Sequence, residues 1–158
     1  MQKTMRLLVL VLLANAAFLQ EVAAANEFTP PMPKDKCPVC GMFVYKYQKW
    51  VAEIVFKDGS YVVFDGCKDM FKYYFDMAKF TKTKSRDDIA EIYVTEYYTL
   101  KISKASEVLF IVGSDVLGPM GHELIPVKGE DAAKIFMIGH LGDKAFRFDE
   151  IHPTDIPK

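Results

Sequence analysis

The chain has 158 residues, of which 51% are hydrophobic and 26% charged, and its formal net charge is −1 at pH 7. A nucleic-acid-binding protein normally presents a basic face, and a protein of an anionic membrane surface is normally basic as well, so neither class is expected. No segment after residue 25 has the ~18 consecutive apolar residues that a membrane-spanning helix needs.

Residues 1–25 have the pattern of a secretory signal peptide. Lys3 and Arg6 form a short positive region, an apolar run covers residues 7–19, and the alanines at 23–25 suit a cleavage site. An uncleaved N-terminal anchor is the alternative. No cysteine lies at the end of the apolar run, so there is no lipobox and a lipid anchor is not expected. We expect a soluble periplasmic protein with a mature chain long enough for one compact domain.

The mature chain begins with residues 26–36, where three prolines and few apolar residues predict an extended leader. Residues 37–158 are expected to form the domain. In its first unit, about 37–100, Asp58-Gly59 lies between two β-type runs and predicts a hairpin. In residues 67–80 the apolar residues recur at helical spacing. The strands are expected over 50–56, 61–64 and 89–100, the last as one strand or two, and the helix over 67–80.

The second unit, about 101–158, repeats this order. Its strands are expected over 107–112, 123–127 and 144–151, with a turn-rich loop over 113–121 and a helix over 129–141. Each half is thus strand–strand–helix–strand. Short strands joined by hairpin signals predict antiparallel pairing, so we expect an α+β protein made of two small ββαβ units packed as one compact domain.

The chemistry of the chain is expected at Cys37-Pro38-Val39-Cys40-Gly41-Met42, which places two thiols and a thioether within six residues. Two residues between cysteines let both sulfur atoms turn toward one point. Soft sulfur ligands select Cu(I), Zn(II) or Fe–S clusters, and a thioether favours copper. Cys37, Cys40 and Met42 are therefore candidate metal ligands.

Three interpretations of the cysteine pair remain open at this point. Cys37 and Cys40 could hold a metal, form a small disulfide, or act in thiol–disulfide exchange. Redox enzymes place this motif at the start of a helix, and Phe43-Val44-Tyr45 is not a helix start. Cys67, alone at the start of the first predicted helix, is expected to be a buried apolar residue.

Two further candidates lie in the turn-rich loop. Met120 stands between Pro119 and Gly121, so a loop is expected there in place of a helix or a central strand. A methionine on an exposed loop is a candidate thioether ligand. The alternative is that it packs under its own loop. His122 offers a nitrogen ligand two residues further on. No Ser-His-Asp set, phosphate loop or carboxylate pair indicates a hydrolase.

The sequence resembles the NosL family of copper-binding accessory proteins for nitrous oxide reductase maturation. The resemblance covers nearly all of the mature chain, in order. The matching segments are 37–44, the strand with Asp58-Gly59, 63–66, 69–74, Gly118-Pro119-Met120-Gly121, the helix with Ile135-Phe136, and 145–148. This chain lacks the lipobox that is common in the family.

Membership implies an exported protein that binds one Cu(I) and passes it to nitrous oxide reductase, alongside a membrane transporter complex. It implies no enzymatic activity, no small-molecule substrate, and a fold similar to that of organomercurial lyase. By position, Cys40 and Met42 match the family's copper motif, Met120 is the distant thioether, and Cys37 is the other cysteine. The alternatives are a periplasmic thiol–disulfide oxidoreductase, or a carrier of soft metal for another oxidoreductase.

Overall fold

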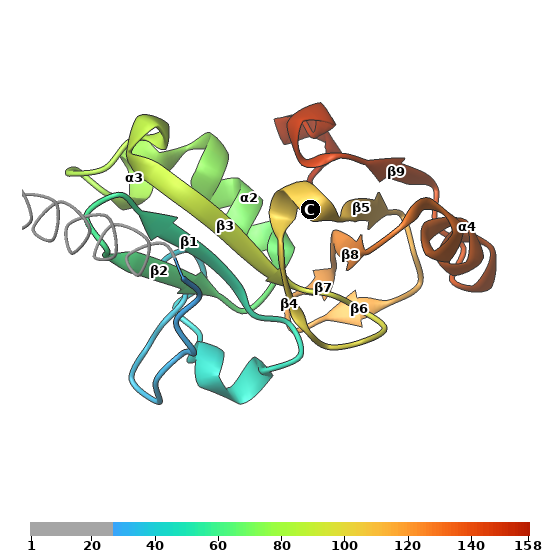
Figure 1. The fold of residues 1–158 in the computed structure, drawn as a ribbon, viewed down its shortest axis with the longest axis horizontal. Helices are drawn as coiled ribbons and strands as arrows, with labels where there is room; N and C mark the ends of the chain where they lie inside the picture. The colour runs from blue at the N-terminus through green and yellow to red at the C-terminus, as the bar shows by residue number, and fades with distance from the viewer. Residues whose placement is uncertain (1–26) are drawn as a thin grey trace, which may run out of the picture.

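The computed structural model describes residues 27–158, so the predicted signal peptide lies outside the described residues. Figure 1 shows two groups of strands side by side, each with its own helices. The larger sheet has the order β2-β1-β3-β4 and the smaller sheet the order β8-β5-β9. The strands are β1 Ala52–Phe56, β2 Tyr61–Phe64, β3 Ile89–Thr95, β4 Ile102–Lys104, β5 Leu109–Val112, β6 Leu117–Gly118, β7 Gly121–His122, β8 Ile125–Val127 and β9 Lys144–Phe146. The α-helices are α2 Cys67–Phe75, α3 Met77–Phe80 and α4 Glu130–Gly139, and the 3-10 helices are η1 Val44–Tyr47, η2 Arg86–Asp88, η3 Ala105–Glu107, η4 Phe148–Glu150 and η5 Pro153–Asp155.

The first hairpin forms where the sequence predicts it. β1 and β2 pair antiparallel, with Ala52 opposite Phe64 and Val55 opposite Tyr61. Gly59 has a φ of +81°, which glycine adopts without steric cost. The Asp58 carboxylate accepts a hydrogen bond from the Ser60 amide at 3.1 Å, which stabilises the turn locally.

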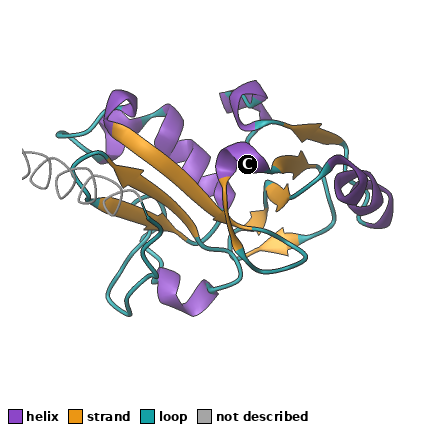
Figure 2. Ribbon diagram, viewed as in Figure 1, coloured by secondary structure: helices purple, strands orange, loops and turns teal. Residues whose placement is uncertain are grey.

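The helical segment predicted over 67–80 is wrong as a single helix, because it is interrupted at Asp76. The break has φ −133° and ψ 53°, outside the helical region, and separates α2 from α3. Aspartate has a poor helix propensity, since its short side chain competes for backbone hydrogen bonds. The two helices cover one face of the larger sheet (Figure 2).

The second unit has the same connectivity as the first. β1 lies between β2 and β3, and β5 lies between β8 and β9, so each of them pairs antiparallel with the strand before the helix and with the strand after it. The separate hairpin of β6 and β7 is inserted between β5 and β8. The prediction of an α+β protein with two ββαβ units is therefore confirmed. The larger sheet also gains β4, so its pairing continues past residue 100.

Four segments differ from the sequence prediction. The strand expected over 89–100 ends at Thr95, where β3 ends. The last strand ends at Phe146 instead of continuing to 151, because η4 begins at Phe148, where the Arg147 amide donates to the Glu150 carboxylate at 2.7 Å. The turn-rich loop contains the hairpin of β6 and β7. A 3-10 helix, η1, begins at Val44, although no helix start was expected there.

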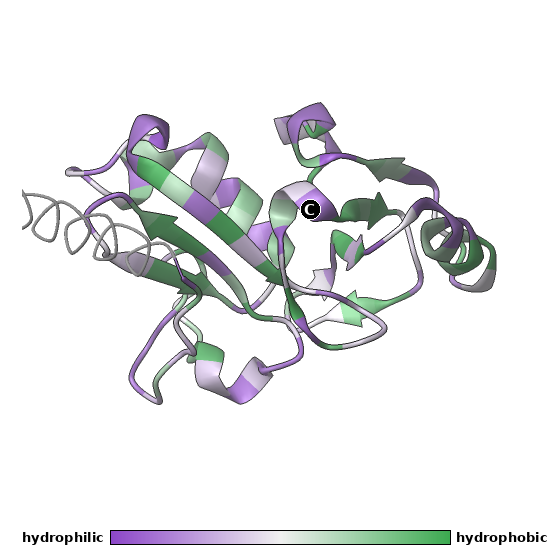
Figure 3. Cartoon of the chain, in the orientation of Figure 1, coloured by the Kyte–Doolittle hydropathy of each residue, from purple (hydrophilic) through white to green (hydrophobic). Residues whose placement is uncertain are grey.

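The larger of two hydrophobic clusters contains residues of both units, and the smaller one packs α4 on the second sheet. Figure 3 shows hydrophobic residues in the strands of both sheets and in the helices. Phe71 of α2 meets Phe110 of β5 edge-on, with ring centroids 5.0 Å apart. Both rings are fully buried. The leader also packs on the domain: the Thr29 amide donates to the Glu53 carboxylate at 2.9 Å. Within residues 27–158, no helix is long and apolar enough to cross a membrane.

Candidate metal centre

The Cys37–Met42 loop is closed by two backbone hydrogen bonds. The Cys37 amide donates to the Met42 carbonyl at 2.9 Å, and the Gly41 amide donates to the Cys37 carbonyl, also at 2.9 Å. Gly41 has a φ of +79°, and no atom lies within 4 Å of a Cβ built there, so backbone conformation alone accounts for glycine. The tight turn directs both cysteines toward the protein, with Cys37 buried and Cys40 partly exposed.

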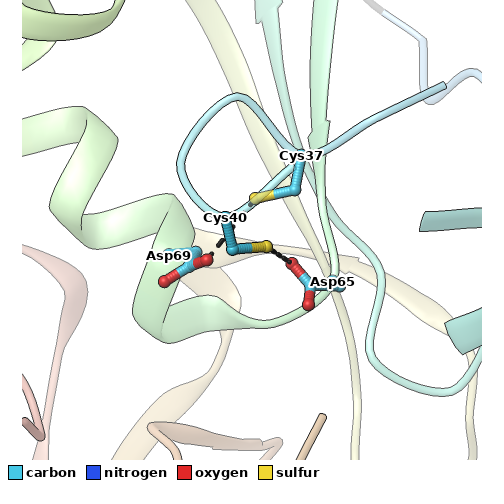
Figure 4. Close-up of side chains that lie close together, drawn as sticks. All are labelled: Cys37, Cys40, Asp65 and Asp69. Atoms are coloured by element: carbon cyan, nitrogen blue, oxygen red, sulfur yellow. Dashed lines mark hydrogen bonds between the residues drawn. The ribbon is translucent and has the colours of Figure 1, made fainter. Parts of the chain in front are cut away.

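Two aspartates from the start of α2 complete a four-residue cluster. Asp65 directly precedes the Gly66 cap, and Asp69 lies in the first turn of the helix. The Cys40 thiol donates to Asp65 Oδ1 at 3.1 Å, and the Cys37 thiol is 3.5 Å from Asp69 Oδ2 (Figure 4). One possible ligand atom from each of the four residues lies within 4.8 Å of the others. We call Cys37, Cys40, Asp65 and Asp69 the Cys/Asp cluster.

The environment of the cluster keeps both thiols protonated near neutral pH. Burial raises the pKa of Cys40 to about 11. The Asp65 carboxylate adds to the shift, because it accepts a hydrogen bond from the protonated thiol. Burial also raises the pKa of Cys37, which is the more enclosed of the two. Desolvation disfavours a charged thiolate, and nearby carboxylates repel it, so both effects act in the same direction.

The carboxylates leave part of the cluster's negative charge uncompensated. Asp69 Oδ1 accepts a hydrogen bond from Lys72 Nζ at 3.1 Å. In contrast, Asp65 Oδ2 is buried and has no hydrogen-bond partner within the described chain. A buried carboxylate oxygen without a partner is costly, and a bound cation would relieve that cost. Two sulfur donors beside this oxygen fit a soft cation better than a hard one.

In the described part of the chain, the histidine predicted as a ligand, His122, is not grouped with the cluster residues, and no contact joins Met42 or Met120 to the thiols. Met42 is partly buried in the same loop as the cysteines. Met120 is 45% exposed at the turn between β6 and β7, and His122 is exposed on β7, so both are contributed by the second unit. Cys67 is buried outside the cluster, as expected for an apolar residue. The three cysteines are free thiols.

The sequence analysis did not identify Asp65 and Asp69 as parts of the site. Asp65-Gly66 marks the end of a strand, and Asp69 reads as an ordinary polar residue of an amphipathic helix. The available signal was the position of both residues at a helix start, where acidic side chains are favoured. Nothing in their spacing indicated that the start of α2 would contact the cysteine loop, because Cys40 lies 25 residues before Asp65 in the sequence.

The raised thiol pKa values lead to a prediction for alkylation. In the metal-free protein at pH 7 we expect Cys40 to react with iodoacetamide more than roughly tenfold more slowly than free cysteine, because little thiolate is present. The rate should continue to rise with pH up to about 11. Mass spectrometry of timed reactions would locate the modified residue. A rate that reaches its plateau near pH 7 would contradict the prediction.

The architecture and the cluster together define a small α+β protein with a sulfur-containing site suited to a soft cation. The sequence profile of the NosL family matches residues 29–156, and the chain belongs to the NosL family. The resemblance seen in the sequence is thereby confirmed. A comparison with curated proteins gives no match.

A solved structure agrees with this assignment. The crystal structure of the copper chaperone NosL from Shewanella denitrificans is similar to this chain with a TM-score of 0.68 and 22% sequence identity. The alignment covers 82% of this chain and 98% of that chain. At this identity the likeness establishes the fold alone.

Proposed function

We propose that this protein is an exported metallochaperone that binds Cu(I) at the Cys/Asp cluster and delivers it for the maturation of nitrous oxide reductase. A membrane transporter complex would be its second partner. The family and the copper chaperone of the same fold support the carriage of copper. The observation that carries the proposal is the grouping of two free thiols with two buried carboxylates, one of which has an oxygen without a hydrogen-bond partner within the described chain.

The two cysteines would have different roles in holding the copper cargo. Cys37 is 1% exposed and would retain the metal, whereas Cys40 is partly exposed and could be reached by a donor or an acceptor. Met42 in the same loop and Met120 on the hairpin would supply thioethers. A thioether carries no charge and no proton, so it can bind and release Cu(I) without a change in protonation.

The aspartates would act mainly by accepting hydrogen bonds from the thiols and by placing negative charge beside them. Carboxylates are hard ligands and are poor direct partners for Cu(I). Placed 3.1 Å and 3.5 Å from the two sulfur atoms, they orient the thiols in the metal-free protein. Their charge favours the entry of a cation into a site that is otherwise enclosed by apolar residues.

Transfer by ligand exchange suits a site with few sulfur donors and an accessible edge. A closed cage of four ligands would hold the metal too firmly for delivery, whereas a partly exposed thiol lets an acceptor ligand bind before the first bond breaks. The alternative of a thiol–disulfide oxidoreductase requires a cysteine with a lowered pKa. Both cysteines have the opposite shift, and the cluster does not support that activity.

The proposal can be tested on the mature protein purified without oxygen. We expect one copper per chain by elemental analysis, and two fewer titratable thiols in the loaded protein than in the metal-free protein. Zinc at equal concentration is the control, and it should not displace the copper. Failure to bind Cu(I), combined with a disulfide that cycles rapidly, would favour the oxidoreductase instead.

The proposed location carries its own prediction. Cleavage after Ala25 should release a mature chain that begins at Asn26 and is recovered with the soluble periplasmic fraction. Mass spectrometry of the N-terminus after cell fractionation is the measurement. An acyl group on the mature chain, or a membrane-bound form that still begins at Met1, would contradict this location.

A further inference from the structure

A buried lysine and a buried glutamate connect the two units beside the Cys/Asp cluster. Lys68 of α2 is 2% exposed and Glu123, between β7 and β8, is 3% exposed. Burial raises the pKa of the Glu123 carboxyl to about 8, although the Lys68 charge opposes the shift. Charged side chains are almost never fully buried without a structural or functional reason. The proposed ligand set leaves both of them unexplained.

Each residue of this pair forms a hydrogen bond with the other unit. Lys68 Nζ donates to the Met120 carbonyl at 2.6 Å, which attaches the turn of the hairpin to α2. In return, Glu123 Oε1 accepts hydrogen bonds from the Lys68 amide and from the Leu124 amide. The second unit thereby supplies the acceptor for an amide in the first turn of α2, because the cap residue Gly66 has no side chain to do so.

Two glycines make room for this carboxylate. A Cβ at Gly66 would lie 1.9 Å from Glu123 Oε2, and a Cβ at Gly118 would lie 3.2 Å from the same atom. Neither residue has its backbone in the left-handed region, so close approach accounts for glycine at both positions. The carboxylate is therefore enclosed between the start of α2 and the hairpin of β6 and β7.

The same helical turn contacts the cysteines. Lys68 holds the Met120 turn, while the adjacent Asp69 faces the Cys37 thiol. We propose that Lys68 and Glu123 are positioning residues that fix the hairpin on α2. They thereby hold the Met120 sulfur at a position from which it can bind copper held by the cysteines. This inference rests on the proposed function, because it requires that Met120 contribute to Cu(I) binding.

The test is a set of Cu(I) affinities, measured by competition with a chromophoric chelator, together with the NMR signal of the Met120 ε-methyl group. Met120→Leu keeps the side-chain volume and removes the sulfur. We expect Met120→Leu and Lys68→Met each to weaken binding by roughly five- to tenfold, and the double variant to bind no more weakly than either one, since both changes remove the same interaction. The Met120 methyl signal should shift on copper loading in the unaltered protein and not in Lys68→Met.

Lys57→Met is the matched control. Lys57 Nζ also donates to a backbone carbonyl at 2.6 Å, that of Asp87, but this bond lies away from the hairpin. The control should keep both the affinity and the methyl shift. If Lys68→Met does not fold, Glu123→Gln gives a second test at about pH 9, above the pKa of about 8 of the Glu123 carboxyl, because it keeps the volume and an acceptor oxygen while it removes the charge that lies near Lys68. It should reduce the methyl shift and weaken binding.

The outcomes separate the two proposals. Wild-type affinity and methyl shift in a folded Lys68→Met variant, or in Glu123→Gln where that variant replaces it, would overturn the positioning role and leave the chaperone intact. Wild-type affinity in Met120→Leu, with no methyl shift in the unaltered protein, would overturn the positioning role while the cysteines still bind copper. Absence of any Cu(I) binding by the unaltered protein would overturn the proposed function itself.

Discussion

Replacement of Cys40 by alanine is expected to weaken Cu(I) binding by more than about tenfold, because a thiolate is the strongest soft donor available to the site. Cys40 is the accessible thiol of the cluster, and its partner Asp65 would then face an empty position. Competition with a chromophoric Cu(I) chelator measures the change. An unchanged binding constant would exclude Cys40 as a ligand and leave Cys37 with the thioethers.

Cys67→Ala is the matched control for this variant. It removes a thiol of the same kind from the same unit, but from a buried position outside the cluster. We expect its Cu(I) affinity to equal that of the unaltered protein, and the loss of a small buried side chain to lower the free energy of unfolding by roughly 1 kcal/mol. Thermal unfolding of both variants would separate lost binding from lost structure.

The second large effect is the dependence of Cu(I) affinity on pH. The pKa of Cys40 is raised to about 11 and that of Cys37 is raised as well, so both thiols are protonated in the metal-free protein between pH 6 and pH 8. A thiol must lose its proton to bind a metal. The affinity should therefore increase by about a hundredfold between pH 6 and pH 8 for each thiol that releases its proton to solvent.

This dependence also decides whether Cys37 is a ligand. If both cysteines bind, the affinity of the unaltered protein should rise twice as steeply with pH, on a logarithmic scale, as that of Cys37→Ala. Equal slopes would show that Cys37 keeps its proton. An affinity that does not change with pH, after correction for the protonation of the chelator, would exclude thiolate ligands altogether.

The architecture was largely predictable because its signals are local. The Asp58-Gly59 turn, the alternation of apolar residues around it and the helical spacing after Cys67 each depend on a few neighbouring residues. The errors occur where a single residue changes the backbone, at Asp76 between α2 and α3 and at Phe148 after β9. Phe148 still reaches the core, since its ring packs 5.2 Å from that of Phe71.

The site was predictable only in part, because it is assembled from segments that are distant in sequence. The turn of Cys37 to Gly41 could be expected from its own residues. The approach of Asp65 and Asp69 could not, because it depends on where α2 packs. Nor could spacing show that Lys68 is buried, since lysines at the start of an amphipathic helix are normally solvated.

The separations along the chain imply an order in which these contacts form. The Cys/Asp cluster joins residues that are 25 and 32 positions apart, whereas the bonds of Lys68 to Met120 and Glu123 span 52 and 55 positions. The entropy lost on closing a flexible loop grows by about 0.6 kcal/mol for each doubling of its length, so shorter closures are favoured early. We expect the cysteines to meet their carboxylates as soon as the first unit folds. The second unit would then dock the hairpin of β6 and β7, with Met120 at its turn, beside a Cys/Asp cluster that has already formed.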